Sequence, residues 1–179
     1  MLIGLISDTH IPEAGKELPP QVYKAFRGVE LILHAGDMHV IEVLDCLEQI
    51  APVLAARGNG DHVYSSMPNR PGVPEDPRVK EVHIIPVGGL TIGLTHDFPL
   101  PEEVITPHDK LMDILLGTRT DVIVCGHSHI QLVRKINGTL IVNPGSPTLP
   151  WGRFELGTVG LLEMANGEAI ARIVDLKSL

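Results

Sequence analysis

The first third of the chain alternates between short continuous apolar runs and stretches with helical spacing. Leu2 to Ile6 is a continuous apolar run, typical of a strand buried on both faces, and residues 31–33 and 52–56 repeat the pattern. Between these runs, apolar residues recur at helical spacing over 40–50, and 21–27 is a shorter helical candidate. This order of strands and helices predicts a parallel sheet with right-handed crossovers.

Hairpins dominate the rest of the chain. The pairs Asn137-Gly138 and Asn166-Gly167 are typical of tight turns between antiparallel strands. The predicted hairpin strands are 82–87 with 90–95, 133–136 with 139–142, and 160–165 with 168–174. A buried strand is predicted over 121–125, and a helix over 101–116 with an irregular start near Pro107. We therefore expect an α/β fold in which two sheets pack face to face with helices outside, as one domain over residues 1–179.

Prolines recur at every third residue between positions 68 and 77. This period is typical of extended polyproline II chain. We interpret the segment as a stiff surface loop, with a ligand-binding lid as the alternative, because long loops are only sometimes functional.

Composition narrows the classes of function. Hydrophobic residues make up 44% of the 179 residues and aromatic residues only 3%, so aliphatic side chains must build the core. The net charge of −8 argues against a nucleic-acid polymer or an anionic membrane as partner, although bound metal ions could still attract an anionic substrate. Cys46 and Cys125 lack the spacing of metal ligands and are predicted to be buried. With no signal-like or membrane-spanning segment in the sequence, we expect a cytoplasmic protein.

Polar side chains follow the predicted strands where each strand ends. They are Asp8, His10, Asp37, Asn59, His96, His127 and His129. Binding sites of open α/β sheets assemble at the carboxyl ends of the strands. Carboxylate, imidazole and amide donors without a thiolate favour Mn²⁺, Fe or Zn²⁺ over Ca²⁺ or a structural zinc. Seven such side chains, one of them shared, are enough for two metal ions.

The spacing of these residues suggests how they are presented. In extended chain, residues i and i+2 point the same way, so Asp8 with His10 and His127 with His129 would each form a two-pronged ligand. Glycines at 36, 58 and 126 are predicted to let the backbone turn sharply before the ligands. Each motif alone has an ordinary explanation as a turn or a partly buried histidine, but the complete ordered set favours a metal site.

The ordered set resembles the calcineurin-like metallophosphoesterases over nearly the whole chain. The motifs are Asp8-x-His10, Gly36-Asp37, Gly58-Asn59-x-Asp61, His96 and Gly126-His127-x-His129. The short chain and the stretches HAGD, RGNGD and NPGS look most like the YfcE-like phosphodiesterase subfamily. The resemblance implies a two-sheet sandwich flanked by helices, with a dinuclear metal site at its edge.

The resemblance also implies a role for each residue. Asp8, His10 and His129 would hold one divalent metal ion, Asn59, His96 and His127 the other, and Asp37 would bridge them. Mn²⁺ is the first expectation, with Zn²⁺, Fe or Ni²⁺ as alternatives. A hydroxide activated by the two metals would attack a small phosphodiester, with Asn59, Asp37 and His96 as catalytic residues. The alternatives are a phosphomonoesterase on the same site and a non-catalytic interaction module such as that of retromer, and a homo-oligomer is compatible with the subfamily.

The chain departs from the family pattern at two places. Gly60 stands where the subfamily often has Cys and protein phosphatases have a histidine, and Asp97 follows His96 where Gly is common. Asp61 is expected to support its loop. His62 and Arg153 are interpreted as surface residues, with leaving-group acid and phosphate contact as the respective alternatives. His34 and His39 are interpreted as supporting residues around Asp37.

Overall fold

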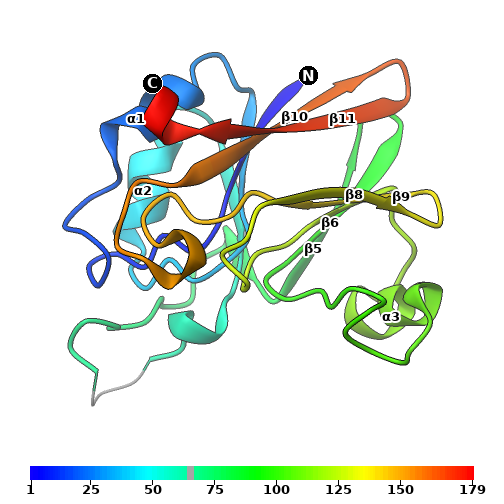
Figure 1. Ribbon diagram of the computed structural model, residues 1–179, viewed down its shortest axis with the longest axis horizontal. Helices are drawn as coiled ribbons and strands as arrows, with labels where there is room; N and C mark the ends of the chain where they lie inside the picture. Colours follow the sequence, from blue (N-terminus) through cyan, green and yellow to red (C-terminus); the bar gives the residue numbers. More distant parts are fainter. Residues whose placement is uncertain (64–66) are drawn as a thin grey trace.

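Two β-sheets pack face to face, with helices on their outer faces, in the computed structural model (Figure 1). It describes residues 1–63 and 67–179. The first sheet has the strand order β11-β10-β1-β2-β3-β4. The strands of this sheet are β1 Leu2–Ile6, β2 Leu31–His34, β3 Val53–Ala56, β4 Val79–Lys80, β10 Thr158–Ala165 and β11 Glu168–Asp175. Strands β1 to β4 are parallel, and β10 and β11 form an antiparallel hairpin beside β1.

The second sheet has the order β5-β6-β7-β9-β8. The strands of this sheet are β5 Val82–Val87, β6 Leu90–Thr95, β7 Val122–Val124, β8 Leu132–Ile136 and β9 Thr139–Asn143. Strands β6, β7 and β9 are parallel, and the two edge strands run against them. Helices α1 Pro20–Ala25 and α2 Glu42–Glu48 cover the first sheet, and α3 His108–Leu115 covers the second (Figure 1). Short 3₁₀ helices occupy Asn59–Asp61, Pro150–Gly152 and Leu176–Ser178.

The core explains why the strands are continuous apolar runs. On β1, Ile3 and Leu5 face the opposite sheet, whereas Ile6 faces the layer of helices α1 and α2. A strand buried on both faces has no polar side to alternate with the apolar one. Gly4 contributes differently, because a Cβ there would lie 3.0 Å from the ring of Phe26, which packs directly on the strand.

The predicted fold class is confirmed, and most predicted elements lie within two residues of their observed bounds. The predicted helix over 101–116 is too long, since α3 begins only at His108. Pro107 immediately precedes it, and the chain before a proline is disfavoured in helical conformation. Strand β4 was not predicted because two residues carry no readable pattern. Cys125 is buried as predicted, but Cys46 is only half-buried.

The proline-rich segment contains no helix or strand from residue 67 to 77. It is nevertheless fastened to the body of the protein. Val73 donates a backbone hydrogen bond of 2.8 Å to Asp61, and the Arg57 guanidinium donates one of 2.7 Å to the Val73 carbonyl. The segment is therefore a surface loop held against the chain that follows β3.

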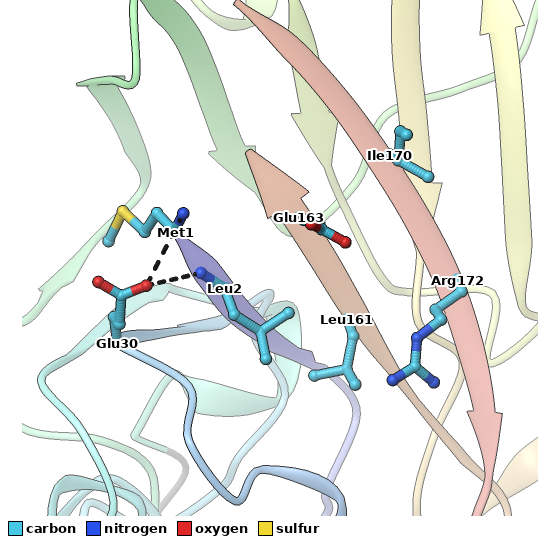
Figure 2. Close-up of a pocket in the computed structure, with 7 residues that line it drawn as sticks. All are labelled: Met1, Leu2, Glu30, Leu161, Glu163, Ile170 and Arg172. Atoms are coloured by element: carbon cyan, nitrogen blue, oxygen red, sulfur yellow. Dashed lines mark hydrogen bonds and ion pairs between the residues drawn. The ribbon is translucent and has the colours of Figure 1, made fainter. Parts of the chain in front are cut away.

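A pocket of about 400 Å³ opens at the amino end of β1 (Figure 2). Its lining includes Glu30, Ile170 and Arg172, and Glu30 accepts a 2.9 Å hydrogen bond from the Leu2 backbone. This is the end of β1 opposite to Asp8, and no imidazole lines the pocket among the described residues. In that same described part of the chain, no helix is long and apolar enough to cross a membrane.

Candidate metal centre

The polar residues predicted from the strand ends come together at one edge of the sandwich. Asp8 and His10 follow β1, Asp37 follows β2, Asn59 opens the 3₁₀ helix after β3, His96 follows β6, and His127 and His129 follow β7. Parallel strands in both sheets place their carboxyl ends on the same side, so residues far apart in sequence meet there. The structure thus brings all seven into one cluster.

One group combines a carboxylate with two imidazoles. The Nε2 atoms of His10 and His129 lie 3.1 Å apart. Asp8 Oδ1 lies 3.5 Å from Nε2 of His129 and 3.9 Å from Nε2 of His10. These three residues can each offer one ligand atom to a common metal ion. Asp8 and His10 are buried, so this is the inner half of the centre.

The other group combines an amide with two imidazoles. Asn59 Oδ1 lies 3.0 Å from His96 Nε2 and 3.1 Å from His127 Nδ1. The two ring nitrogens are 3.3 Å apart. His96 is buried, whereas Asn59 and His127 are exposed, so this half of the centre faces solvent.

Asp37 lies between the two groups. Its Oδ2 is 3.7 Å from His10 Nε2, and its Oδ1 is 3.5 Å from His96 Nε2. The Gly60 backbone donates a 2.7 Å hydrogen bond to Oδ1 and fixes the carboxylate. One carboxylate therefore contacts an imidazole of each group, which is the geometry that a bridging ligand requires.

The ring orientations test whether these residues fit a cation. His96 Nδ1 donates to the Ala35 carbonyl at 2.7 Å, and His129 Nδ1 donates to the Leu149 carbonyl at 2.9 Å. Because Nδ1 carries the proton in each ring, Nε2 presents a lone pair to the cluster. Nε2 of His96 then faces the Asn59 oxygen, another acceptor. Two acceptors cannot form a hydrogen bond with each other, but both can coordinate a cation that lies between them.

The backbone conformation of the ligand pairs differs from the extended chain that we predicted. Left-handed φ angles occur at Asp8 (53°), His10 (48°), Asp37 (56°), His39 (70°), His127 (67°) and His129 (58°). Non-glycine residues adopt this region uncommonly, and such strain clusters at functional sites. Backbone hydrogen bonds from Asp8 to the Gly36 carbonyl and from His10 to the Asp37 carbonyl hold the turns together. The i and i+2 side chains do converge, but in tight turns.

The glycines also act differently from the prediction. Gly36 has the expected left-handed φ of 94°, whereas Gly58 and Gly126 do not adopt such angles. Their role is to permit close approach. A Cβ on Gly58 would lie 2.2 Å from Asp37 Oδ1, and one on Gly126 would lie 1.8 Å from Ser7 Oγ. The neighbouring loops could not meet with side chains at these positions.

Asp61 supports its loop as expected. Its buried carboxylate accepts hydrogen bonds of 2.8–2.9 Å from the backbones of Gly58, Asp37, Met38 and His39. It thereby joins the turn after β2 to the turn after β3, which carry Asp37 and Asn59.

Burial controls the protonation of the inner group. It raises the pKa of Asp8 well above the usual range, and the neighbouring Asp37 carboxylate adds to the effect. Burial lowers the pKa of His10 to about 3 and also lowers that of His129. Burial alone would raise the pKa of Asp37, but the His96 imidazole and the Gly60 N–H outweigh it and leave a net decrease. Neutral imidazoles at neutral pH are the form that binds metal.

Asp8→Asn is expected to raise the melting temperature of the metal-free protein at pH 7. The pKa of Asp8 is higher in the folded state than in the unfolded state, so stability falls as pH rises through the folded value. Asparagine removes this loss of stability because it carries no charge, but it also removes the carboxylate that would bind the metal. Differential scanning calorimetry with and without Mn²⁺ checks both effects. A variant that melts lower than wild type without metal, or is stabilised equally by Mn²⁺, would contradict this account.

The remaining histidines brace the centre or lie outside it. His34 is buried, accepts from the Gly36 backbone and donates to Thr9 Oγ1 at 3.2 Å, which matches the supporting role predicted. His62 is exposed, as predicted, and Arg153 is also exposed. His83 contacts the Ala55 carbonyl at 3.0 Å. Among the described residues, the candidate metal-binding groups of His, Cys, Asp and Glu side chains include none of these histidines.

Sequence reasoning missed Glu13 and Arg70 and gave His39 only a general supporting role. Glu13 Oε2 lies 3.9 Å from His10 Nδ1 and 3.6 Å from His39 Nδ1. His39 also accounts for the unusual Gly60, because a Cβ on Gly60 would lie 2.5 Å from His39 Nε2. The only local sign of His39 was its repetition of the Asp-x-His spacing in Asp37-x-His39.

The family of the protein follows from comparison with known sequences. A model of the calcineurin-like phosphoesterase superfamily domain matches residues 1–167. The chain belongs to the calcineurin-like phosphoesterase superfamily. This confirms the resemblance drawn from the motifs. The protein is thus a metallophosphoesterase by family, and the cluster described above supplies its candidate metal-binding groups.

This superfamily member is similar in sequence to two archaeal proteins and in fold to a solved structure. It is 40% identical over 150 residues to a probable metallophosphoesterase of Methanothermobacter thermautotrophicus, covering 84% of this chain and 79% of that one. It is 24% identical over 153 residues to phosphodiesterase MJ0936 of Methanocaldococcus jannaschii, covering 81% and 83%. Its fold is similar to that of Vps29 of Entamoeba histolytica complexed with Zn²⁺, with a TM-score of 0.66, 22% identity and coverage of 98% and 99%.

Proposed function

We propose that this protein is a metal-dependent phosphodiesterase that hydrolyses small phosphodiesters at the cluster on the carboxyl edge of the sheets. The observation that carries the proposal is the position of Asp37, within 3.5–3.7 Å of one imidazole from each ligand group. A carboxylate shared in this way suits two cations held close together. The name of the related phosphodiesterase MJ0936 supports the same reaction class.

The ligand assignment follows the two groups. Asp8, His10 and His129 would hold the inner cation, and Asn59, His96 and His127 the outer one, with Asp37 shared. When bound, a pair of divalent cations polarises the phosphoryl group and lowers the pKa of water. Oxygen and nitrogen donors without thiolate make Mn²⁺ the first candidate, with Zn²⁺, Fe and Ni²⁺ as alternatives.

The protein's own groups orient the ligands and receive the substrate. The hydrogen bonds of His96 to Ala35 and of Asp37 to Gly60 hold these side chains before any substrate arrives. Such preorganisation avoids reorganisation during the reaction. Because Asn59 and His127 are exposed, the substrate would approach the outer group, and Asn59, Asp37 and His96 are the proposed catalytic residues.

A small pocket beside His127 favours a diester over a monoester. Its volume is about 200 Å³. The apolar part of its lining is Phe98, Leu100, Cys125, Ile130 and Leu132. Its charged residues are Asp97 and Glu103, and no Lys or Arg lines it in the described part of the chain. Carboxylates beside the site repel a doubly charged monoester more than a singly charged diester. The pocket suits a small, uncharged and largely apolar ester group.

We further propose that residues 1–179 act as one metallophosphoesterase domain. The candidate ligands come from both sheets and extend in sequence from Asp8 to His129. Neither sheet alone could therefore assemble the site.

Metal reconstitution tests the proposed function. Protein stripped with a chelator and resupplied with Mn²⁺ is expected to hydrolyse bis-p-nitrophenyl phosphate faster than p-nitrophenyl phosphate. Asp97→Asn should narrow the ratio of the two rates, because one repulsive charge is removed. Asp113→Asn removes an exposed carboxylate of α3 and is the matched control, expected to keep the wild-type ratio. Absence of turnover with Mn²⁺, Zn²⁺, Fe²⁺ and Ni²⁺ would favour a non-catalytic module instead.

A further inference from the structure

His10 has a second ring nitrogen, Nδ1, that the candidate ligand set does not use. Its Nε2 points at Asp8 and His129, but its Nδ1 is buried and has no hydrogen-bond partner in the described part of the chain. A buried imidazole nitrogen without a hydrogen-bond partner destabilises the folded state. The carboxylate of Glu13 lies 3.9 Å from it. In His96 and His129, by contrast, a backbone carbonyl accepts directly from Nδ1.

His39 lies against the same carboxylate. Its side chain is fully buried, its Nδ1 is 3.6 Å from Glu13 Oε2, and its ring packs edge-on to His10 with centroids 4.5 Å apart. Neither nitrogen of His39 forms a hydrogen bond with any described residue. Its other side abuts Gly60, where only a hydrogen atom fits. The His39 ring therefore restricts the tilt of the His10 ring. Glu13 Oε2 lies 3.6–3.9 Å from Nδ1 of both imidazoles, without a hydrogen bond to either.

Arg70 holds Glu13 in place. Its Nε and Nη2 atoms donate to the two carboxylate oxygens at 2.8 and 3.1 Å. Such a bidentate pair is among the stronger and more directional polar contacts in proteins. The hydrogen bonds from Arg70 lower the pKa of Glu13, so the carboxylate stays ionised. Arg70 belongs to the proline-rich segment, which Val73 and Arg57 fasten to the chain after β3.

We propose that Glu13, fixed by Arg70, is a positioning residue that orients His10 toward the inner cation and strengthens it as a ligand. When Nε2 of a histidine takes a cation, Nδ1 carries the proton, and a carboxylate facing that proton increases the basicity of the ring. Glu13 is the carboxylate in that position for His10. The proline-rich segment is thereby tied to the affinity of the centre. This inference rests on the proposed dinuclear centre.

Titration calorimetry of metal-free protein with Mn²⁺ alone tests the inference. Glu13→Gln removes the charge and keeps the shape, so it is expected to weaken one of the two binding events about 10–100-fold and to spare the other. Arg70→Gln, which releases Glu13, should weaken the same event. The matched control is Glu102→Gln, since Glu102 forms an exposed ion pair with Arg134. If Glu13→Gln does not fold, Arg70→Gln tests the same ion pair by removing its other partner.

The outcomes separate this inference from the proposed function. Selective weakening of one event, with a melting temperature of the metal-free variant equal to that of wild type, would support positioning. Wild-type affinity at both sites in Glu13→Gln would overturn the inference and leave the dinuclear centre standing. Equal weakening of both events with a lower melting temperature would also overturn it, because that is the result of general destabilisation. Wild-type protein that binds no Mn²⁺ would overturn the proposed function itself.

Discussion

Asp37→Ala is expected to remove both cations and to lower hydrolysis of bis-p-nitrophenyl phosphate by more than about 100-fold. Loss of a partner that only orients a ligand costs about 10–100-fold in affinity or activity, and a shared direct ligand should exceed that. Asp37 contacts imidazoles of both groups, at 3.7 and 3.5 Å, so neither half of the centre is complete without it. Elemental analysis after dialysis against Mn²⁺, with a parallel rate measurement, checks the expectation.

Two variants sharpen this prediction. Asp37→Asn keeps one side-chain oxygen, so it should retain more metal than Asp37→Ala but less than wild type. Asp113→Ala, on the exposed face of α3, should retain two metal ions per chain and the wild-type rate. The bridging role is refuted if Asp37→Ala still binds two metal ions.

Gly126→Ala is expected to destabilise the protein and to inactivate it. A Cβ at this position would lie 1.8 Å from Ser7 Oγ and 2.7 Å from Asp8 Oδ2. The backbone cannot readily retreat, because Gly126 donates to the His96 carbonyl at 2.8 Å and accepts from Asn143 Nδ2 at 2.7 Å. Overpacking of this kind costs about 1–3 kcal/mol or more. For a chain of this size, that corresponds to a fall in melting temperature of about 2–12 °C.

The loss of activity should exceed what the loss of stability explains. The His127 backbone donates to both oxygens of Asp8 at 3.1–3.2 Å, so pushing Asp8 away from Gly126 disturbs the contact between the first and last ligand turns. Gly15→Ala is the control, because its Cβ would meet atoms only at 3.7 Å. Thermal denaturation and rates measured well below the melting temperature separate the two effects. A Gly126→Ala protein with wild-type melting temperature and rate would show that the loops adjust freely.

The fold was largely predictable because strands buried on both faces appear in the sequence as continuous apolar runs. β1 is apolar throughout because Ile3 and Ile6 face different layers of the sandwich. The limits appear where the pattern is short or interrupted. β4 has two residues, and the start of α3 depends on Pro107 rather than on apolar spacing. Neither feature has a periodicity long enough to read.

The candidate ligands were predictable as a group, but the backbone conformation that carries them was not. Position at strand ends indicated that Asp8 and His127 would meet, whereas left-handed turns follow from the hydrogen bonds between loops and have no local pattern in sequence. Glu13 and Arg70 are 57 residues apart and form an ion pair only after folding. Gly60 was a visible departure, but its cause is the His39 ring, which comes from a different loop.

The most direct test of the dinuclear centre is anomalous scattering from crystals soaked in Mn²⁺. Two peaks are expected at the carboxyl edge of the sheets. One should contact Asp8, His10 and His129, the other should contact Asn59, His96 and His127, and Asp37 should lie between them. A map without peaks at this edge, or with a single peak that does not contact Asp37, would contradict the account.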